Sequence, residues 1–192
     1  MEVPNVYVHA FAGGGLSYLS SSDIKDVVSD DFGIGLGLPT WSYGLRGGFR
    51  TIAQVSLNIG RANHNFNNNS IIPDIPSEVI EMDYETTDVQ FKVNPFFWRT
   101  SRTASGQGKA WFLVWGFTEV DWKDEVGDGF SGKGNIIGIE YALVSTYLSG
   151  NFSFKRYAID FDQTILFGLP FTTETSASDW IFEIKIGFGL GI

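Results

Sequence analysis

Few residues in this chain have side chains suited to catalysis or to metal binding. The 192 residues contain two histidines and no cysteine, which excludes a disulfide framework and a thiolate metal site. His64 lies in the polar run of residues 63–70, where a solvated imidazole is the expected state. His9 has no serine two residues away with which to form a nucleophile and base pair. Neither histidine is therefore a predicted catalytic group.

The acidic residues offer two further possibilities. Asp160 and Asp162 share one face of a period-two segment, and neighbouring carboxylates can raise each other's pKa for acid and base catalysis. A salt-bridged structural pair is the simpler interpretation. The acidic loop of residues 121–128 could attract Ca²⁺, but it lacks the ligand spacing of an EF-hand. We therefore predict no enzyme, no metal site and no cofactor, with a lipid-modifying enzyme as the remaining catalytic alternative.

The elements that carry these residues have the period of β-strands, in which side chains point alternately to two faces. The last segment, residues 180–192, has Trp, Phe, Ile and Leu on one face, and mostly Glu183, Lys185 and glycines on the other. Similar segments cover residues 5–14, 31–38, 42–61, 86–98, 109–122, 135–148 and 152–169. We predict a single domain spanning residues 1–192, with eight strands and a turn at residues 39–41.

Connection lengths and composition indicate whether the outer face of these strands meets lipid or water. Long connections after alternate strands and short turns after most others are typical of membrane barrels. No run of about 18 apolar residues occurs, which excludes a transmembrane helix. The formal net charge of −9 argues against nucleic acid as a partner. The chain opens Met-Glu-Val-Pro without a basic or apolar leader, and we expect that a signal peptide has been removed.

Side-chain volume favours an outward-facing apolar surface. The interior of an eight-stranded barrel is only just wide enough for one filling of side chains, so the bulky groups of eight strands cannot all point inward. The remaining alternative is a soluble ligand-binding barrel or sandwich, which would expose many glycines to water. In a membrane barrel, several aromatic residues near strand ends would form interfacial girdles. These residues are Trp98, Trp111, Trp122, Tyr147 and Trp180.

At the level of pattern, the whole chain resembles the small bacterial outer-membrane β-barrel class, which includes OmpA-, OmpX- and OmpW-like barrels. No motif specific to one family is matched. The resemblance implies an antiparallel up-and-down transmembrane barrel in the bacterial outer membrane, with short periplasmic turns and long extracellular loops. Members usually end in Phe or Trp, so Ile192 indicates a trimmed terminus or an atypical assembly signal.

The lumen of such a barrel would contain ionisable groups that must be paired, because an isolated buried charge costs several kcal/mol. The predicted charged cluster is Glu140, Asp160, Asp162, Glu183, Lys185 and Arg46 or Arg50. A second cluster is predicted at the periplasmic end, where Tyr7, His9 and Phe11 would fill the space left by two glycine triplets. We expect these triplets to be Gly33, Gly35 and Gly37 on one side and Gly187, Gly189 and Gly191 on the other.

Two functional hypotheses follow. The first is a passive channel or conduit for a small solute, including an apolar one, with a closed or narrowly gated lumen. The second is a structural or adhesion protein of the envelope that acts through its extracellular loops. The expected partners are the lipid bilayer and lipopolysaccharide, and the expected oligomeric state is a monomer.

Overall fold

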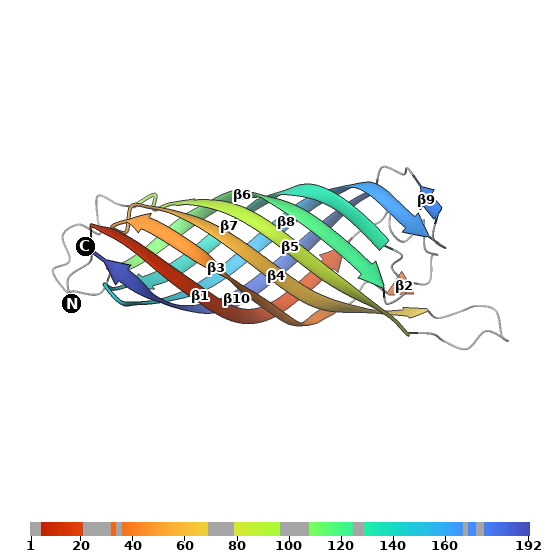
Figure 1. The fold of residues 1–192 in the computed structure, drawn as a ribbon, viewed down its shortest axis with the longest axis horizontal. Coiled ribbons are helices and arrows are strands. Elements are labelled where there is room, and N and C mark those ends of the chain that lie inside the picture. The colour runs from red at the N-terminus through yellow and green to blue at the C-terminus, as the bar shows by residue number, and fades with distance from the viewer. Residues whose placement is uncertain are drawn as a thin grey trace.

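The computed structural model describes residues 5–20, 32–33, 36–68, 79–96, 108–124, 129–166, 169–171 and 175–192. Its long strands are antiparallel and wind around a common axis (Figure 1). They are β1 (Val6–Ser20), β3 (Leu36–Phe49), β4 (Ala53–Asn68), β5 (Val79–Val93), β6 (Gly108–Asp124), β7 (Gly129–Val144), β8 (Leu148–Leu166) and β10 (Thr175–Gly191). Two short strands, β2 (Phe32–Gly33) and β9 (Leu169–Phe171), pair with β4 and β8. No helix in the described part of the chain is long and apolar enough to span a membrane.

The sheet closes on itself. Each long strand pairs with the next long strand along the chain, and β10 pairs with both β8 and β1. The closing register runs from Tyr7 opposite Gly191 to Ser20 opposite Ser178. The predicted eight-stranded antiparallel barrel is confirmed for these described strands. Closure pairs the backbone groups of every long strand, as a structure surrounded by lipid requires.

Both ends of the chain lie at one end of the barrel (Figure 1). The backbones of Val6 and Ile192 exchange two hydrogen bonds of 2.9 Å there. Strand β1 runs away from this end, so β3 and, by the same alternation, β7 run back toward it. The tight connections at residues 50–52 and 145–147 follow β3 and β7 and therefore lie at the same end. Short turns face the periplasm in outer-membrane barrels, so we call this the periplasmic end.

The predicted turn at residues 39–41 is wrong, because this segment lies inside β3. The turn follows instead at Arg50, which has a left-handed φ of 49°. Pro39 has no backbone N–H to donate to a ladder. The β1–β3 register shifts between Gly15 and Ser17, opposite this proline, and the irregularity accommodates it within the strand.

A band of exposed apolar side chains surrounds the barrel. It includes Val8, Leu45, Leu57, Leu113, Ile139, Phe154 and Ile186. On β10 the prediction from the sequence holds, since Ile184 and Phe188 point outward while Glu183 and Lys185 are buried. An apolar belt of this extent on a monomer is unusual in water and fits a lipid environment.

The polarity of the two faces reverses beyond this band, toward the end opposite the termini. Outward positions there are charged, including Arg61, Glu85, Glu119, Lys133 and Asp160. The inward positions instead form an apolar cluster of Tyr84, Trp122, Phe130, Ile136, Ile159 and Phe161. The long strands have 14 to 19 residues, whereas about 9–11 suffice to cross a bilayer. The strands are therefore longer than a bilayer crossing requires, and the charged part, which we call the extension, has an outer face suited to water and not to lipid.

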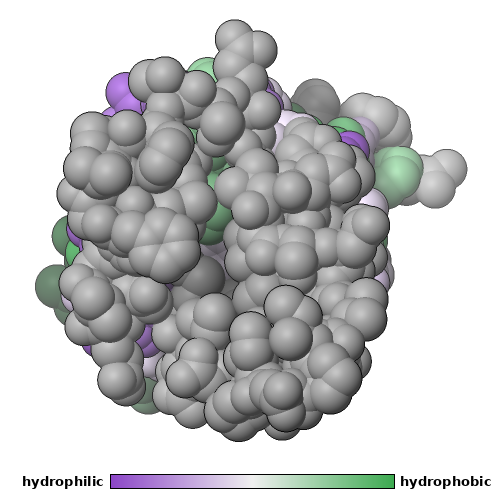
Figure 2. Space-filling view, turned by 90° about the vertical axis from the view of Figure 1, so that its right-hand side faces the viewer, coloured by the Kyte–Doolittle hydropathy of each residue, from purple (hydrophilic) through white to green (hydrophobic). Residues whose placement is uncertain are grey.

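The view along the axis from this extended end is shown in Figure 2. Both hydrophilic and hydrophobic side chains of the described residues come to the outer rim (Figure 2). This mixture agrees with a wall that passes from a charged extension to an apolar band.

Candidate functional site

The periplasmic end of the lumen is filled by rings. Tyr7, His9 and Phe11 point inward from β1, with exposed fractions of 1%, 0% and 5%. They lie opposite Gly191, Gly189 and Gly187 of β10, as the sequence predicted. Phe112, Ala110, Ala142 and Val144 pack with Tyr7 and complete this aromatic plug.

The glycines on the other side of the plug differ from those predicted. Tyr7 lies opposite Gly48 of β3, and Phe11 lies opposite Gly44. A Cβ atom on Gly48 would overlap the ring of Tyr7. Gly37 instead pairs with Ser17 near the far end of β1. The prediction involving the triplet from Gly33 to Gly37 is wrong because the turn lies about ten residues later than expected.

His9 has a partner that sequence reasoning missed. Its Nδ1 atom lies 2.9 Å from the hydroxyl oxygen of Ser149, and its Nε2 atom lies 3.4 Å from the backbone oxygen of Thr146. Ser149 is 140 residues away in sequence, and strand pairing alone brings it close. Both side chains are buried, so a substrate cannot reach them in this conformation. The pair anchors the plug to the turn between β7 and β8.

Glu183 is the centre of the first ion-pair cluster above the plug. Its Oε2 atom accepts from the ammonium groups of Lys155 at 2.8 Å and Lys185 at 2.9 Å. Its Oε1 atom accepts from the hydroxyl of Ser42 at 2.8 Å. A buried carboxylate needs such partners because removal from water costs several kcal/mol per ion. The arrangement meets that requirement with groups from β3, β8 and β10.

Glu140 is the centre of the second cluster. Its Oε2 atom lies 2.5 Å from Lys92 Nζ, and its Oε1 atom lies 3.9 Å from Arg46 Nη1. Arg46 also donates to the amide oxygen of Asn151 at 2.9 Å. Its guanidinium lies 5.0 Å from the centre of the Phe11 ring. This contact joins the charged middle of the lumen to the aromatic plug.

Asp88 adds a third acidic group on the inner wall. It accepts a hydrogen bond from the Tyr157 hydroxyl at 2.7 Å and one from the Gln90 amide at 3.0 Å. A cavity of about 20 Å³ borders Asp88 and Glu183, which is roughly the room of one water molecule. Beyond it, the apolar cluster around Trp122 fills the extended part of the barrel, with Trp122 and Phe130 centroids 5.5 Å apart.

The structure places some predicted lumen residues elsewhere. Asp160 and Asp162 are exposed on the outside of β8, so their assignment to the lumen is wrong. Placing these two aspartates in the lumen implied that the bulky residues on the opposite face of the segment 152–169 meet lipid. Those residues, Tyr157, Ile159 and Phe161, instead lie inside the part that extends beyond the band. Because the wrong face of β8 was assigned to the lumen, Lys155 was not predicted there. Its side chain is fully buried and central to the ion-pair network.

Two other positions also need correction. Arg50 lies in the exposed turn and donates to Asn5, so it does not enter the lumen. Trp122 was expected in an interfacial girdle, but its side chain is completely buried. It lies on the extension, where large apolar groups point inward. The side chains of Trp111, Tyr147 and Trp180 do point outward, and Trp98 lies outside the described residues.

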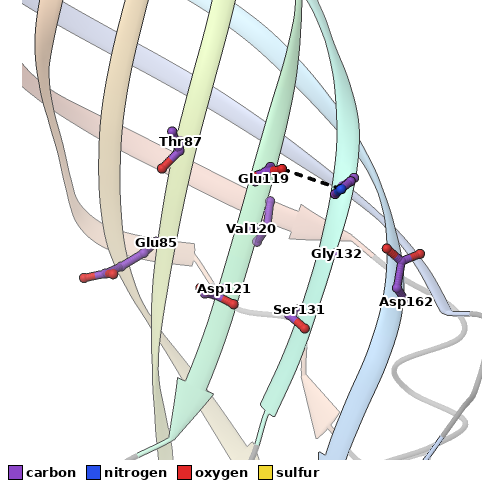
Figure 3. Close-up of a pocket in the computed structure, with 9 residues that line it drawn as sticks. Glu85, Thr87, Glu119, Val120, Asp121, Ser131, Gly132 and Asp162 are labelled. Atoms are coloured by element: carbon purple, nitrogen blue, oxygen red, sulfur yellow. Dashed lines mark ion pairs between the residues drawn. The ribbon is translucent and has the colours of Figure 1, made fainter.

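The outer surface of the extension carries a shallow acidic depression of about 410 Å³ (Figure 3). Glu85, Glu119, Asp121 and Asp162 line it from three of the four strands β5 to β8. Lys133 lies beside them and pairs with Glu119 at 3.6 Å, as the dashed line in Figure 3 marks. Acidic groups therefore outnumber basic ones on this water-facing wall.

Comparison with known proteins bears on the fold. No protein-family model and no curated protein matches the sequence. Among solved structures, the outer membrane protein OprG from Pseudomonas aeruginosa superposes with a TM-score of 0.55 at 12% identity, over 100% of this chain and 98% of that one. Neisserial surface protein A gives 0.42 at 13% identity, over 96% of both chains. The attachment invasion locus protein Ail of Yersinia pestis gives 0.34 at 12% identity, over 98% and 100%.

The chain has the fold of the small outer-membrane β-barrels. The OprG superposition extends from end to end of both chains, and the closed antiparallel topology agrees with it. The apolar belt and paired lumen charges found above are the features that this fold requires in lipid.

Proposed function

We propose that this protein is an integral barrel of a bacterial outer membrane that is closed at rest and acts at the cell surface through its water-exposed extension. One observation carries the proposal: side chains occupy the lumen at each level. Tyr7 has an exposed fraction of 1% at the periplasmic end, Glu140 of 0% in the middle and Trp122 of 0% in the extension. A permanently water-filled pore would leave such side chains wet.

The charged extension supports the surface role. Its inner face is an apolar core of the kind found in soluble proteins, which makes the extension rigid without help from lipid. Its outer face presents Glu85, Glu119 and Asp121 to water. A rigid, charged platform above the membrane suits contact with cationic partners, because complementary charge accelerates encounter and selects partners.

A gated conduit is the second candidate, and a specific feature favours it. The inner face of β4 carries Ser56 and Asn58, whose side-chain polar atoms have no hydrogen-bond partner among the described residues. Water satisfies buried polar atoms of this kind. This neutral strip could pass a small solute, including an apolar one, if the Glu140 and Glu183 clusters rearranged.

Conductance separates the two candidates. We expect purified protein in planar bilayers to show no steady conductance steps, with insertion verified by heat-modifiable migration on gels. Brief openings that become more frequent in Glu140→Gln would favour the gated conduit, since this change removes the acceptor charge of Lys92 and Arg46. A steady open conductance in the unmodified protein would refute the closed barrel.

Location is tested independently. We expect the expressed protein, with a secretion signal supplied, to sediment with outer-membrane vesicles and to require detergent for extraction. Recovery as a monodisperse protein in detergent-free buffer would refute the membrane assignment.

A further inference from the structure

A groove lies on the outer, lipid-facing wall, where the apolar band meets the charged extension. It measures about 420 Å³ and is lined by outward side chains that include Leu113, Ile137, Ile139, Phe154 and Trp180. Strand pairing makes the lining continuous, because Leu113 is opposite Ile139, which is opposite Phe154. The groove therefore crosses β6, β7 and β8 at a level where the surrounding medium is hydrocarbon.

Arg156 lies at the end of this groove nearest the charged extension. It lies between Ile137 on β7 and Trp180 on β10 in the strand register. Its guanidinium carbon lies 5.7 Å from the centre of the Trp180 ring. Its Nε and Nη2 atoms donate to the hydroxyl of Ser178 at 3.3 and 2.8 Å. These contacts hold the planar head at the boundary between the apolar band and the charged extension.

The charge of Arg156 distinguishes it from the cations of the charged extension. Arg61, Lys123 and Lys133 each lie within 4.0 Å of a carboxylate. No ion pair joins Arg156 to an acidic group among the described residues. A guanidinium has five N–H donors, and Ser178 engages only one edge of it. The end edge, formed by Nη1 and the second N–H of Nη2, has the geometry to donate to two oxygens of a phosphate.

We infer that this groove is a binding site for a phosphorylated, multiply acylated lipid of the outer leaflet. One acyl chain lies in the groove against Ile139 and Phe154, and a phosphate of the headgroup binds the open fork of Arg156. Charge complementarity selects this occupant over a neutral lipid. The neighbouring wall is acidic at Asp160 and Glu119, so a phosphate is attracted at Arg156 and repelled beside it. The inference rests on the proposed outer-membrane location.

Native mass spectrometry of the detergent-solubilised protein tests the site. The probes are six-chain lipid A with two phosphates, the same lipid A without phosphates, and phosphatidylcholine. We expect one bound lipid A per barrel, retained in preference to the two other probes. An arginine near a membrane surface contributes about 1 kcal/mol of attraction, so Arg156→Gln should weaken binding of phosphorylated lipid A about fivefold.

Matched variants separate the site from general surface charge. Lys133→Gln removes a cation that Glu119 already pairs, and it should leave lipid A binding unchanged. Arg156→Lys keeps the charge without the fork, and its binding should be intermediate. Ile139→Trp fills the groove and should weaken binding of lipid A while leaving heat-modifiable migration intact.

The outcomes can be told apart. Equal retention by the unmodified protein and Arg156→Gln, or equal binding of phosphatidylcholine and lipid A, would overturn the site. If Arg156→Gln fails to fold, the Lys and Ile139 variants decide the matter by the same comparison. Fractionation with the outer membrane together with no lipid preference would refute the site alone. Lipid A binding by a protein that fractionates elsewhere would refute the location alone.

Discussion

Replacing Glu183 by glutamine should strongly destabilise the folded barrel. The change keeps the size of the side chain and removes its charge. Two ammonium groups, those of Lys155 and Lys185, then lie buried without the carboxylate they share at 2.8 and 2.9 Å. Removing one partner of a buried ion pair typically costs about 3–5 kcal/mol, because the other charge stays desolvated.

The loss can be measured by urea unfolding of the protein folded into lipid vesicles, followed by tryptophan fluorescence. With an m-value of about 2 kcal/mol/M, a loss of 3–5 kcal/mol lowers the urea midpoint by roughly 2 M. Asp160→Asn is the matched control. It also neutralises an acid, but on the exposed face of β8, and it should change stability by about 0.5 kcal/mol or less.

A second substitution checks the cause. Adding Lys185→Met to Glu183→Gln removes one of the two stranded charges. The double variant should therefore recover at least about 1 kcal/mol relative to Glu183→Gln alone, as expected for residues in direct contact. A loss below about 1 kcal/mol for Glu183→Gln, or no recovery in the double variant, would refute the view that Glu183 neutralises the lumen.

Two further predictions concern the plug and the reversal of polarity. Gly48→Ala should lower stability by about 1–3 kcal/mol by overpacking, because the new Cβ atom overlaps Tyr7. Gly150→Ala is the control and should be close to neutral, because nothing lies within 4 Å of its Cβ position. Equal effects of the two changes would contradict the predicted packing. In variants with a single tryptophan, lipids brominated along their acyl chains should quench Trp115, which is 51% exposed, but not Trp122, which is 0% exposed; strong quenching of Trp122 would show that it faces lipid.

Much of the fold could be predicted from the sequence because a closed barrel in lipid imposes period-two alternation on every strand. The final strand shows this, since the positions of Ile184, Glu183 and Lys185 relative to the wall follow from alternation alone. The inward positions of Tyr7 and Phe11 agree with the glycines opposite them. These inferences depend only on local pattern and on the volume of the lumen.

The errors occurred where the solvent outside the wall changes. Alternation defines two faces of each strand but does not say which one points inward. The outward face was assigned from the volume of the side chains. At Asp160 and Trp122 the outer face is charged and suited to water, and bulky groups turn inward while charges turn outward. The turn predicted at Pro39 was wrong for another reason. The β1–β3 pairing shifts register opposite this proline, and the irregularity allows it to lie within a strand. The contact of His9 with Ser149 depends on three-dimensional register, which sequence spacing does not contain.

The absence of cysteine from the sequence permits a direct test of a closed barrel that presents a charged wall at the cell surface. Single cysteines are introduced at Ser153, which is fully buried in the lumen, and at Asp160, which is exposed on the extension. Intact cells are then treated with a membrane-impermeant maleimide. We predict rapid labelling of Asp160→Cys and none of Ser153→Cys until the protein is denatured. Equal labelling of both in intact cells would contradict the closed lumen, and no labelling of Asp160→Cys would contradict the surface location.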